Sequence, residues 1–290
     1  MVPRPIGAPL WCGYSQKADA LSQKCNEGAL GILGLFRGLK TMMKQAYMAA
    51  AVAAALATFG AQAQDYQMEG GLTYAHVDAD GSTDSIYGAD FTFHLKQVST
   101  NGRPLAEAAF LGRSSNLGIS YATADKADVD ALNGSGEFFF GDFYGAADVT
   151  QASIGSEDST DFAVRAGFLP MDGLLLTVGY EDLDLADLTA ISLGAKYVVL
   201  LNDGMALNLE ADIKQYDDQD DTIEYTLLAD FYLNSALSFG VRFNDSDADG
   251  SESTVGVGAK YFFTPVISGE IEYANQDKTD TIGARVAMRF

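Results

Sequence analysis

The sequence is poor in several residue types, and its rare residues are concentrated before residue 64. Both cysteines, Cys12 and Cys25, and the single tryptophan, Trp11, lie there. The remainder therefore offers no thiol for a disulfide or for thiolate chemistry. Basic residues are scarce as well, since residues 64–290 hold 12 Lys and Arg against 38 Asp and Glu. This balance argues against nucleic-acid binding, which requires a basic surface.

Long apolar runs are also missing. The Ala-rich run from Met48 to Phe59 is too short to span a bilayer as a helix. It follows a short basic start and precedes Ala61-Gln62-Ala63, which is typical of a secretory signal peptide cleaved after Ala63. A buried core helix is the alternative. We expect residues 42–63 to be the signal peptide and residues 1–41 to lie upstream of the true start, and we expect residues 64–290 to form the mature domain.

Proline occurs only three times after residue 63, at Pro104, Pro170 and Pro265, each at an expected turn. Proline cannot donate to a sheet ladder, so its absence elsewhere agrees with a chain made of strands. The last ten residues show the pattern most clearly, because one face of that strand is apolar and the other carries two arginines. The apolar face consists of Ile282, Ala284, Val286, Met288 and Phe290.

Two kinds of connection alternate along residues 64–290. One kind has the Gly, Pro, Asn and Asp chemistry of tight turns, at 101–104, 141–142, 170–173, 202–204, 234–235 and 264–265. The other kind is acidic, at 78–84, 125–130, 157–161, 181–187, 217–221, 245–252 and 277–280. This alternation predicts an all-β fold, a transmembrane antiparallel up-and-down β-barrel of about 14 strands, with 12 or 16 as alternatives.

One stretch fits this pattern poorly. Residues 105–124 are counted as one strand, but 105–121 do not alternate well. We expect part of this stretch to fold inside the lumen or to form a turn. No long constriction loop is evident in the sequence.

Strand parity separates the side chains into an apolar face and a charged face. Because a Lys or Arg facing lipid costs roughly 2–4 kcal/mol near the midplane, the charged face is expected to line the lumen. An inward-facing core of a soluble sandwich is the alternative for the apolar face. The predicted lumen charges are Arg165, Lys196, Glu210, Asp212, Lys214, Glu224, Asp230, Arg242, Lys260, Glu270, Glu272 and Arg285.

The C-terminal strand resembles the assembly signal of Gram-negative outer-membrane proteins, in which a terminal aromatic residue follows apolar residues at alternate positions. The chain from Gln64 resembles the small porin-like β-barrel proteins as a whole. The resemblance implies an outer-membrane location, with lipid, lipopolysaccharide, the barrel-assembly machinery and small hydrophilic solutes as partners. It does not identify a solute.

Two further motifs were considered. Gly194-Ala195-Lys196-Tyr197 recurs as Gly258-Ala259-Lys260-Tyr261, with a weaker copy at 283–285, which indicates hairpin repetition. The loop containing Asp245, Asp247 and Asp249 matches the start of a calcium loop but lacks the carboxylate at its twelfth position. We interpret it as a solvated acidic loop, with a weak external Ca²⁺ or Mg²⁺ site as the alternative.

An enzymatic role is not expected. The two histidines after residue 63 are His76, on the lipid-facing parity, and His94, on the lumen parity. Neither belongs to a Gly-x-Ser-x-Gly, zinc-ligand or phosphate-binding motif. The sequence therefore predicts no cofactor and a passive, cation-preferring channel for small hydrophilic solutes and ions. A closed structural or interaction barrel with acidic external loops is the alternative.

Overall fold

The computed structural model describes residues 65–201, 204–217 and 221–290. The predicted upstream extension, the signal peptide and its cleavage site at Ala61 and Ala63 lie outside these residues. Within the described part of the chain, no helix is long and apolar enough to cross a bilayer.

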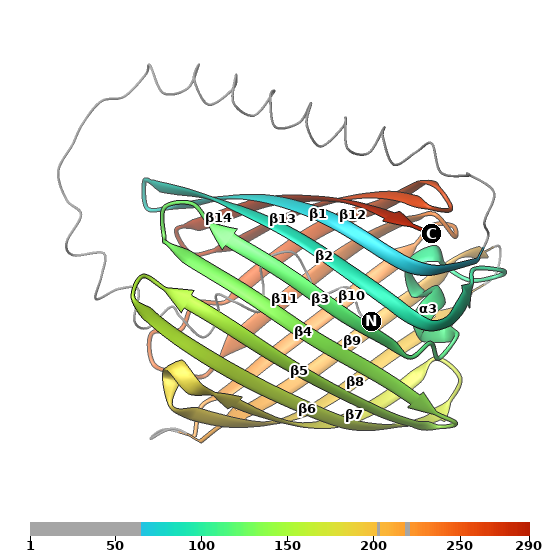
Figure 1. The fold of residues 1–290 in the computed structure, drawn as a ribbon, viewed down its shortest axis with the longest axis horizontal. Helices are drawn as coiled ribbons and strands as arrows, with labels where there is room; N and C mark the ends of the chain where they lie inside the picture. The colour runs from blue at the N-terminus through green and yellow to red at the C-terminus, as the bar shows by residue number, and fades with distance from the viewer. Residues whose placement is uncertain (1–64, 202–203, 218–220) are drawn as a thin grey trace, which may run out of the picture. The chain divides into compact units, whose positions relative to one another are not determined.

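Fourteen strands form one closed antiparallel barrel, in which each strand pairs with the next and β1 pairs with β14 (Figure 1). The predicted fold class and strand number are confirmed. The strands are β1 (Asp65–Ala79), β2 (Ser82–Ser99), β3 (Asn116–Ala124), β4 (Val129–Phe140), β5 (Phe143–Ile154), β6 (Glu157–Met171), β7 (Leu174–Leu183), β8 (Leu188–Leu200), β9 (Ala206–Tyr216), β10 (Ile223–Tyr232), β11 (Leu237–Ser246), β12 (Thr254–Thr264), β13 (Ile267–Gln276) and β14 (Thr279–Arg289).

The two kinds of connection lie at opposite ends of the barrel. Both ends of the strand series, Asp65 and Phe290, lie at what we call the terminal end, together with the tight turns. The acidic connections lie at the other, acidic end. Five of them place an aspartate at positive φ, a conformation that Asp tolerates better than most residues. These are Asp80, Asp128, Asp187, Asp221 and Asp277, so part of the acidic character is turn chemistry.

The expected turn at residues 170–173 is shorter in the structure. Strand β6 continues through Pro170 to Met171, and the pairing with β7 shifts register between Phe168 and Met171. Such an irregularity is a position where a sheet accepts proline, because no ladder hydrogen bond is required from its nitrogen.

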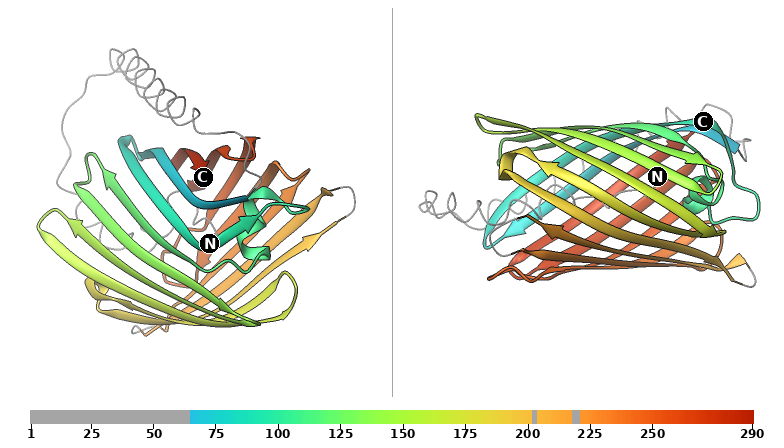
Figure 2. Two further views of the ribbon diagram at one scale, coloured as in Figure 1. Left: turned by 45° about the vertical axis from the view of Figure 1, so that its right-hand side comes forward. Right: turned by 90° about the horizontal axis from the view of Figure 1, so that it is seen from below.

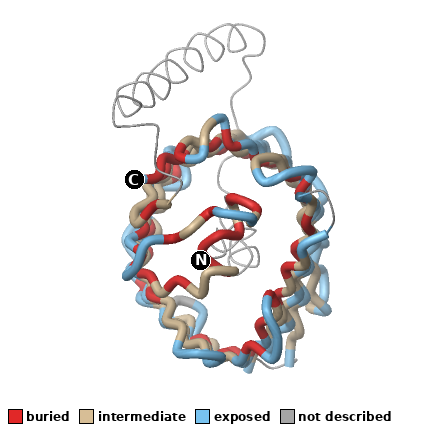
Figure 3. The backbone as a smooth tube through the Cα atoms, turned by 90° about the vertical axis from the view of Figure 1, so that its right-hand side faces the viewer, coloured by how far each residue is buried: buried red, intermediate tan, exposed pale blue. Residues whose placement is uncertain are grey.

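The chain between β2 and β3, residues 100–115, forms no strand, and we call it the strap. It contains η1 (Leu105–Glu107) and α3 (Ala108–Leu111) and lies inside the ring of strands at the terminal end (Figures 2 and 3). The predicted strand at 105–124 is therefore wrong before residue 116, whereas the expectation of a lumenal or turn segment is confirmed. Leu105-Ala-Glu-Ala-Ala-Phe-Leu111 consists mainly of good helix formers, and the barrel interior buries its apolar side chains.

The strap packs against two different parts of the barrel wall. Ala108 and Ala109 form a buried cluster with Tyr66 of β1 and Val98 of β2. Phe110 is buried among Leu169, Leu175 and Val198, which belong to β6, β7 and β8. The segment therefore bridges the lumen between these walls.

The opposite face of the barrel wall is apolar. The outward side chains of β7, β8 and β13 include Val178, Ile191, Leu193 and Ile271, each more than half exposed. In a soluble protein such a continuous apolar surface would promote aggregation, whereas in a membrane it contacts lipid.

Another short 3₁₀ turn, η2 (Asp184–Ala186), lies in the connection between β7 and β8.

Candidate functional site: the strapped lumen

The strand register places all twelve predicted lumen charges on the face opposite the exposed apolar residues. Most of them are paired within the wall. The ion pairs are Arg165–Glu181, Lys214–Glu181, Lys196–Glu210, Arg242–Glu272 and Lys260–Glu270. Arg285 pairs with Asp90 at 2.6 Å and with Glu69 at 3.2 Å.

Three predicted acids have no salt bridge among the described residues. Asp230 accepts a hydrogen bond from Asn208, and Glu224 accepts hydrogen bonds from Tyr216 and Asn244. Asp212 lies on β9, two residues from Lys214 of the same strand, and forms no ion pair with Lys214 or with Arg165 of β6. Carboxylates are therefore left over after the cations are paired.

Sequence reasoning missed several lumen charges. Glu69, Asp90, Glu181 and Arg289 were not selected, although Arg289 has the same parity as Arg285 in the terminal strand. Face parity would have found Glu69 and Asp90 if it had been applied to the first strands. Glu107 had no such signal, because it lies on the strap.

Glu107 joins the strap to the wall. Its carboxylate forms an ion pair with Lys196 at 2.9 Å and accepts a hydrogen bond from the Tyr232 hydroxyl at 2.8 Å. Lys196 also pairs with Glu210 at 2.7 Å and lies 5.0 Å from the centre of the Phe110 ring. Burial raises the pKa of Glu107, but the Lys196 ammonium and the donated hydrogen bonds lower it further, so the net pKa is below the ordinary value.

A second attachment lies at β14. The Arg289 guanidinium donates to the Leu105 carbonyl oxygen at 2.9 Å and to Glu69 at 2.6 Å. It also lies over the rings of Tyr66 and Phe262, with 4.3 and 4.5 Å to their centres. Cations over aromatic faces are attracted to the ring quadrupole, so the guanidinium is held from several sides at once.

The end of the strap is attached to two turns of the terminal end. Arg113 pairs with Asp142 at 2.7 Å and with Asp172 at 3.1 Å, and it donates to the Gly141 carbonyl oxygen. Both aspartates are largely exposed, so water and salt weaken each pair. The buried contacts of Glu107 and Phe110 therefore dominate the attachment.

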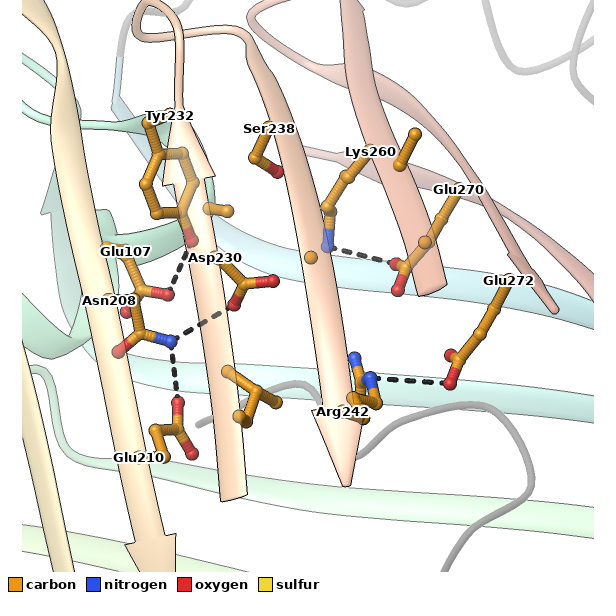
Figure 4. Close-up of a pocket in the computed structure, with 15 residues that line it drawn as sticks. Glu107, Asn208, Glu210, Asp230, Tyr232, Ser238, Arg242, Lys260, Glu270 and Glu272 are labelled. Atoms are coloured by element: carbon orange, nitrogen blue, oxygen red, sulfur yellow. Dashed lines mark hydrogen bonds and ion pairs between the residues drawn. The ribbon is translucent and has the colours of Figure 1, made fainter. Parts of the chain in front are cut away.

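A polar recess lies between the strap and the wall of β9 to β13 (Figure 4). Its volume is about 40 Å³, which accommodates water or a small ion but no sugar-sized solute. Acids outnumber bases in its lining, which includes Glu107, Glu210, Asp230, Arg242, Lys260, Glu270 and Glu272.

The remaining sequence candidates have other environments. His94 is buried beside Tyr66, with ring centres 5.4 Å apart, and His76 pairs across strands with Ser85 and Ile282. Asp247 accepts a hydrogen bond from the Ile223 backbone nitrogen, which is a structural role. Among the described residues, no group of three or more acidic, His or Cys side chains is arranged to hold a metal ion.

The apolar face of the C-terminal strand is only partly exposed. Ile282 is 56% exposed and Phe290 40%, whereas Met288 is 5% exposed. Met288 lies across from Gly70 and Ile267 in the register. Met288 keeps the parity of the apolar face but is buried, and the assembly signal expected at Ile282, Ala284, Val286, Met288 and Phe290 stays a prediction.

Comparisons with known proteins agree with this architecture. Residues 170–290 match the model of the family described as "Putative general bacterial porin". The crystal structure of the Acinetobacter baumannii outer membrane protein Omp33 is 26% identical, with a TM-score of 0.69 over 79% of this chain and 100% of that chain. No curated protein matches the chain.

Two further solved structures are less similar to this chain. Pseudomonas putida OprB at low pH is 10% identical, with a TM-score of 0.45 over 78% of this chain and 92% of that chain. A KdgM porin in complex with disordered oligogalacturonate is 10% identical, with a TM-score of 0.43 over 76% and 99%.

The family match covers β7 to β14, the Omp33 likeness covers 79% of the chain, and the described strands form one closed barrel. The chain is an outer-membrane β-barrel protein of a Gram-negative bacterium, and its residues 170–290 are similar to the family described as putative general bacterial porins.

Proposed function

We propose that this protein is a narrow channel for the passive diffusion of small hydrophilic solutes and ions across the outer membrane, with a preference for cations. The observation that carries the proposal is the charged inner face, which is incompatible with a dry apolar core and requires water. The outer membrane protein Omp33 is similar in structure, and residues 170–290 match the bacterial porin model. Selectivity in barrel lumens depends on size and on rings of charge.

The preference for cations is inferred from the excess of inner carboxylates. The recess beside the strap contains more acids than bases, and Asp212 and Asp230 remain without a salt bridge among the described residues. A negative potential in a confined path raises the local concentration of cations.

A closed structural barrel is the second candidate. The strap crosses the terminal end, its contacts are buried, and the recess beside it is small. These observations favour a lumen that is narrowed at the terminal end. Contacts with lipopolysaccharide, and recognition of Ile282, Ala284, Val286, Met288 and Phe290 by the assembly machinery, remain part of the proposal.

Single-channel recording in planar bilayers separates these candidates. The purified protein is expected to give discrete conductance steps, and a reversal potential in a KCl gradient that indicates K⁺ preference. Asp230→Asn is expected to move that reversal potential toward zero. Asp249→Asn, at the exposed acidic end, is the matched control and is expected to leave the reversal potential unchanged in 1 M salt. A folded, heat-modifiable protein that never conducts would support the closed barrel, and an anion-favouring potential would refute the cation preference.

A further inference from the structure

Inner-face glycines lie directly across from charged residues of neighbouring strands. Among the described residues the pairs are Gly71 with Asp90, Gly179 with Arg165, Gly194 with Asp212, Gly240 with Asp230, Gly256 with Arg242, and both Gly258 and Gly283 with Glu272. Glycine within a strand is destabilising relative to alanine. The recurrence of glycine across from charged residues therefore needs a structural explanation.

The space above these glycines is already occupied by charged side chains. A β-carbon on Gly71 would lie 2.5 Å from Nη2 of Arg285 and 2.6 Å from Oδ1 of Asp90. These atoms belong to the two-pronged ion pair that Arg285 forms with Asp90. The pair thus lies along the barrel wall over Gly71 rather than projecting toward the barrel axis.

At two more glycines, the carboxylate of a single acidic residue occupies the space above the glycine. A β-carbon on Gly194 would lie 2.8 Å from Oδ2 of Asp212 and 2.5 Å from the Thr177 hydroxyl. A β-carbon on Gly240 would overlap the Asp230 carboxylate. By contrast, Gly256 has room, since its nearest neighbour would be Oε1 of Glu272 at 3.5 Å.

The repeated sequence motif contributes two of these arrangements. Gly194-x-Lys196 on β8 faces Glu210-x-Asp212 on β9, and Gly258-x-Lys260 on β12 faces Glu270-x-Glu272 on β13. In each copy the lysine pairs with the first acid, and the glycine lies across from the second. Each copy therefore places two carboxylates beside one lysine, and in the second copy Arg242 of β11 pairs with the second acid, Glu272.

We propose that the inner glycines set the width of the lumen by letting charged side chains lie flat on its wall. This inference rests on the proposed channel function. The effect is greatest at Gly240, because Gly240 and Asp230 line the recess beside Glu107 of the strap, where Figure 4 shows Asp230 next to Asn208 and Tyr232. A β-carbon at Gly240 pushes the Asp230 carboxylate into that recess, which narrows the water-filled path.

Alanine substitutions on opposite faces of the barrel test the proposal. Gly240→Ala and Gly194→Ala are expected to lower the single-channel conductance of the purified protein. Two matched controls are expected to leave it unchanged: Gly256→Ala, on the inner face with free space, and Gly134→Ala, which has no atom within 4 Å of its added carbon. Heat-modifiable migration verifies that each variant is folded.

A second variant keeps the test decisive if Gly240→Ala folds poorly. In Gly240→Ala/Asp230→Ala the displaced carboxylate is absent, so the double variant is expected to conduct as well as Asp230→Ala alone, because the alanine at position 240 then has no carboxylate to displace. If wild type conducts and Gly240→Ala conducts equally well, the inference is overturned while the channel function stands. A fall of equal size in Gly256→Ala also overturns it. A wild-type protein that never conducts overturns the proposed function and this inference together.

Discussion

The two ends of the barrel connect their strands with different chemistry. At the terminal end the β2–β3 connection is 16 residues that turn inward and bury Glu107 and Phe110. At the acidic end the β1–β2 connection is Asp80-Gly81, both at positive φ and both exposed. The comparison shows that the inward connection is specified by tertiary contacts, whereas the outward ones are specified by local turn chemistry.

The charges at the two ends have different consequences. At the terminal end, Lys196 and Glu107 are each about 95% buried and paired at 2.9 Å, so salt screens them little. At the acidic end, Asp249 and Glu252 are exposed and act through a field that salt weakens. Stability is therefore expected to depend on the first group, and the salt dependence of selectivity on the second.

The largest effect is expected from Lys196→Met. Removing the ammonium leaves Glu107 and Glu210 without their cation in a buried site, and breaking a buried pair typically costs about 3–5 kcal/mol. Urea unfolding in detergent or lipid would show this loss, and single-channel conductance is expected to rise as the strap loosens. Lys278→Met, at an exposed position of the acidic end, is the control. Equal unfolding midpoints for the two variants would contradict the role assigned to Lys196.

A smaller effect is expected from acid. The pKa of Glu107 is lower in the folded protein than its ordinary value, so its ionised form contributes stability above the unfolded-state pKa of about 4.3. That contribution decreases as pH falls through the lower, folded-state pKa. The midpoint of thermal unfolding is measured between about pH 6 and about pH 3, where carboxylates titrate. Over this interval wild type is expected to lose more thermal stability than Glu107→Gln does. If both proteins lose the same amount, the linkage to Glu107 is refuted.

The smallest effect is expected at the acidic end. Asp249→Asn combined with Glu252→Gln removes two exposed charges at the acidic end. Cation preference is expected to decrease slightly at about 0.01 M salt, where the Debye length is about 30 Å, and to stay unchanged at 1 M, where it is about 3 Å. Reversal potentials at both salt concentrations test this. A change that persists at 1 M salt would place these residues inside the conducting path.

Local pattern was sufficient to predict most of the barrel. The period-two alternation and the two kinds of connection predict fourteen strands and which side chains of the later strands face inward. These features depend on neighbouring residues, because strand parity and turn chemistry are local. For this reason Arg165, Lys196 and Arg285 share the face opposite the exposed apolar residues, and their pore-lining role stays a prediction.

Only the tertiary structure decided how the inner charges are arranged. Which acid each cation meets depends on strand register and on the closure of β1 against β14, which brings Arg285 to Asp90 across 195 residues of sequence. The strap also lacked a reliable local signal. Leu105–Leu111 favours a helix, but its position inside the lumen follows from contacts of Glu107 with Lys196 and Tyr232 on distant strands. The sequence by itself determined the wall of this protein, and the long-range contacts that appear only when the barrel closes determined what occupies its lumen.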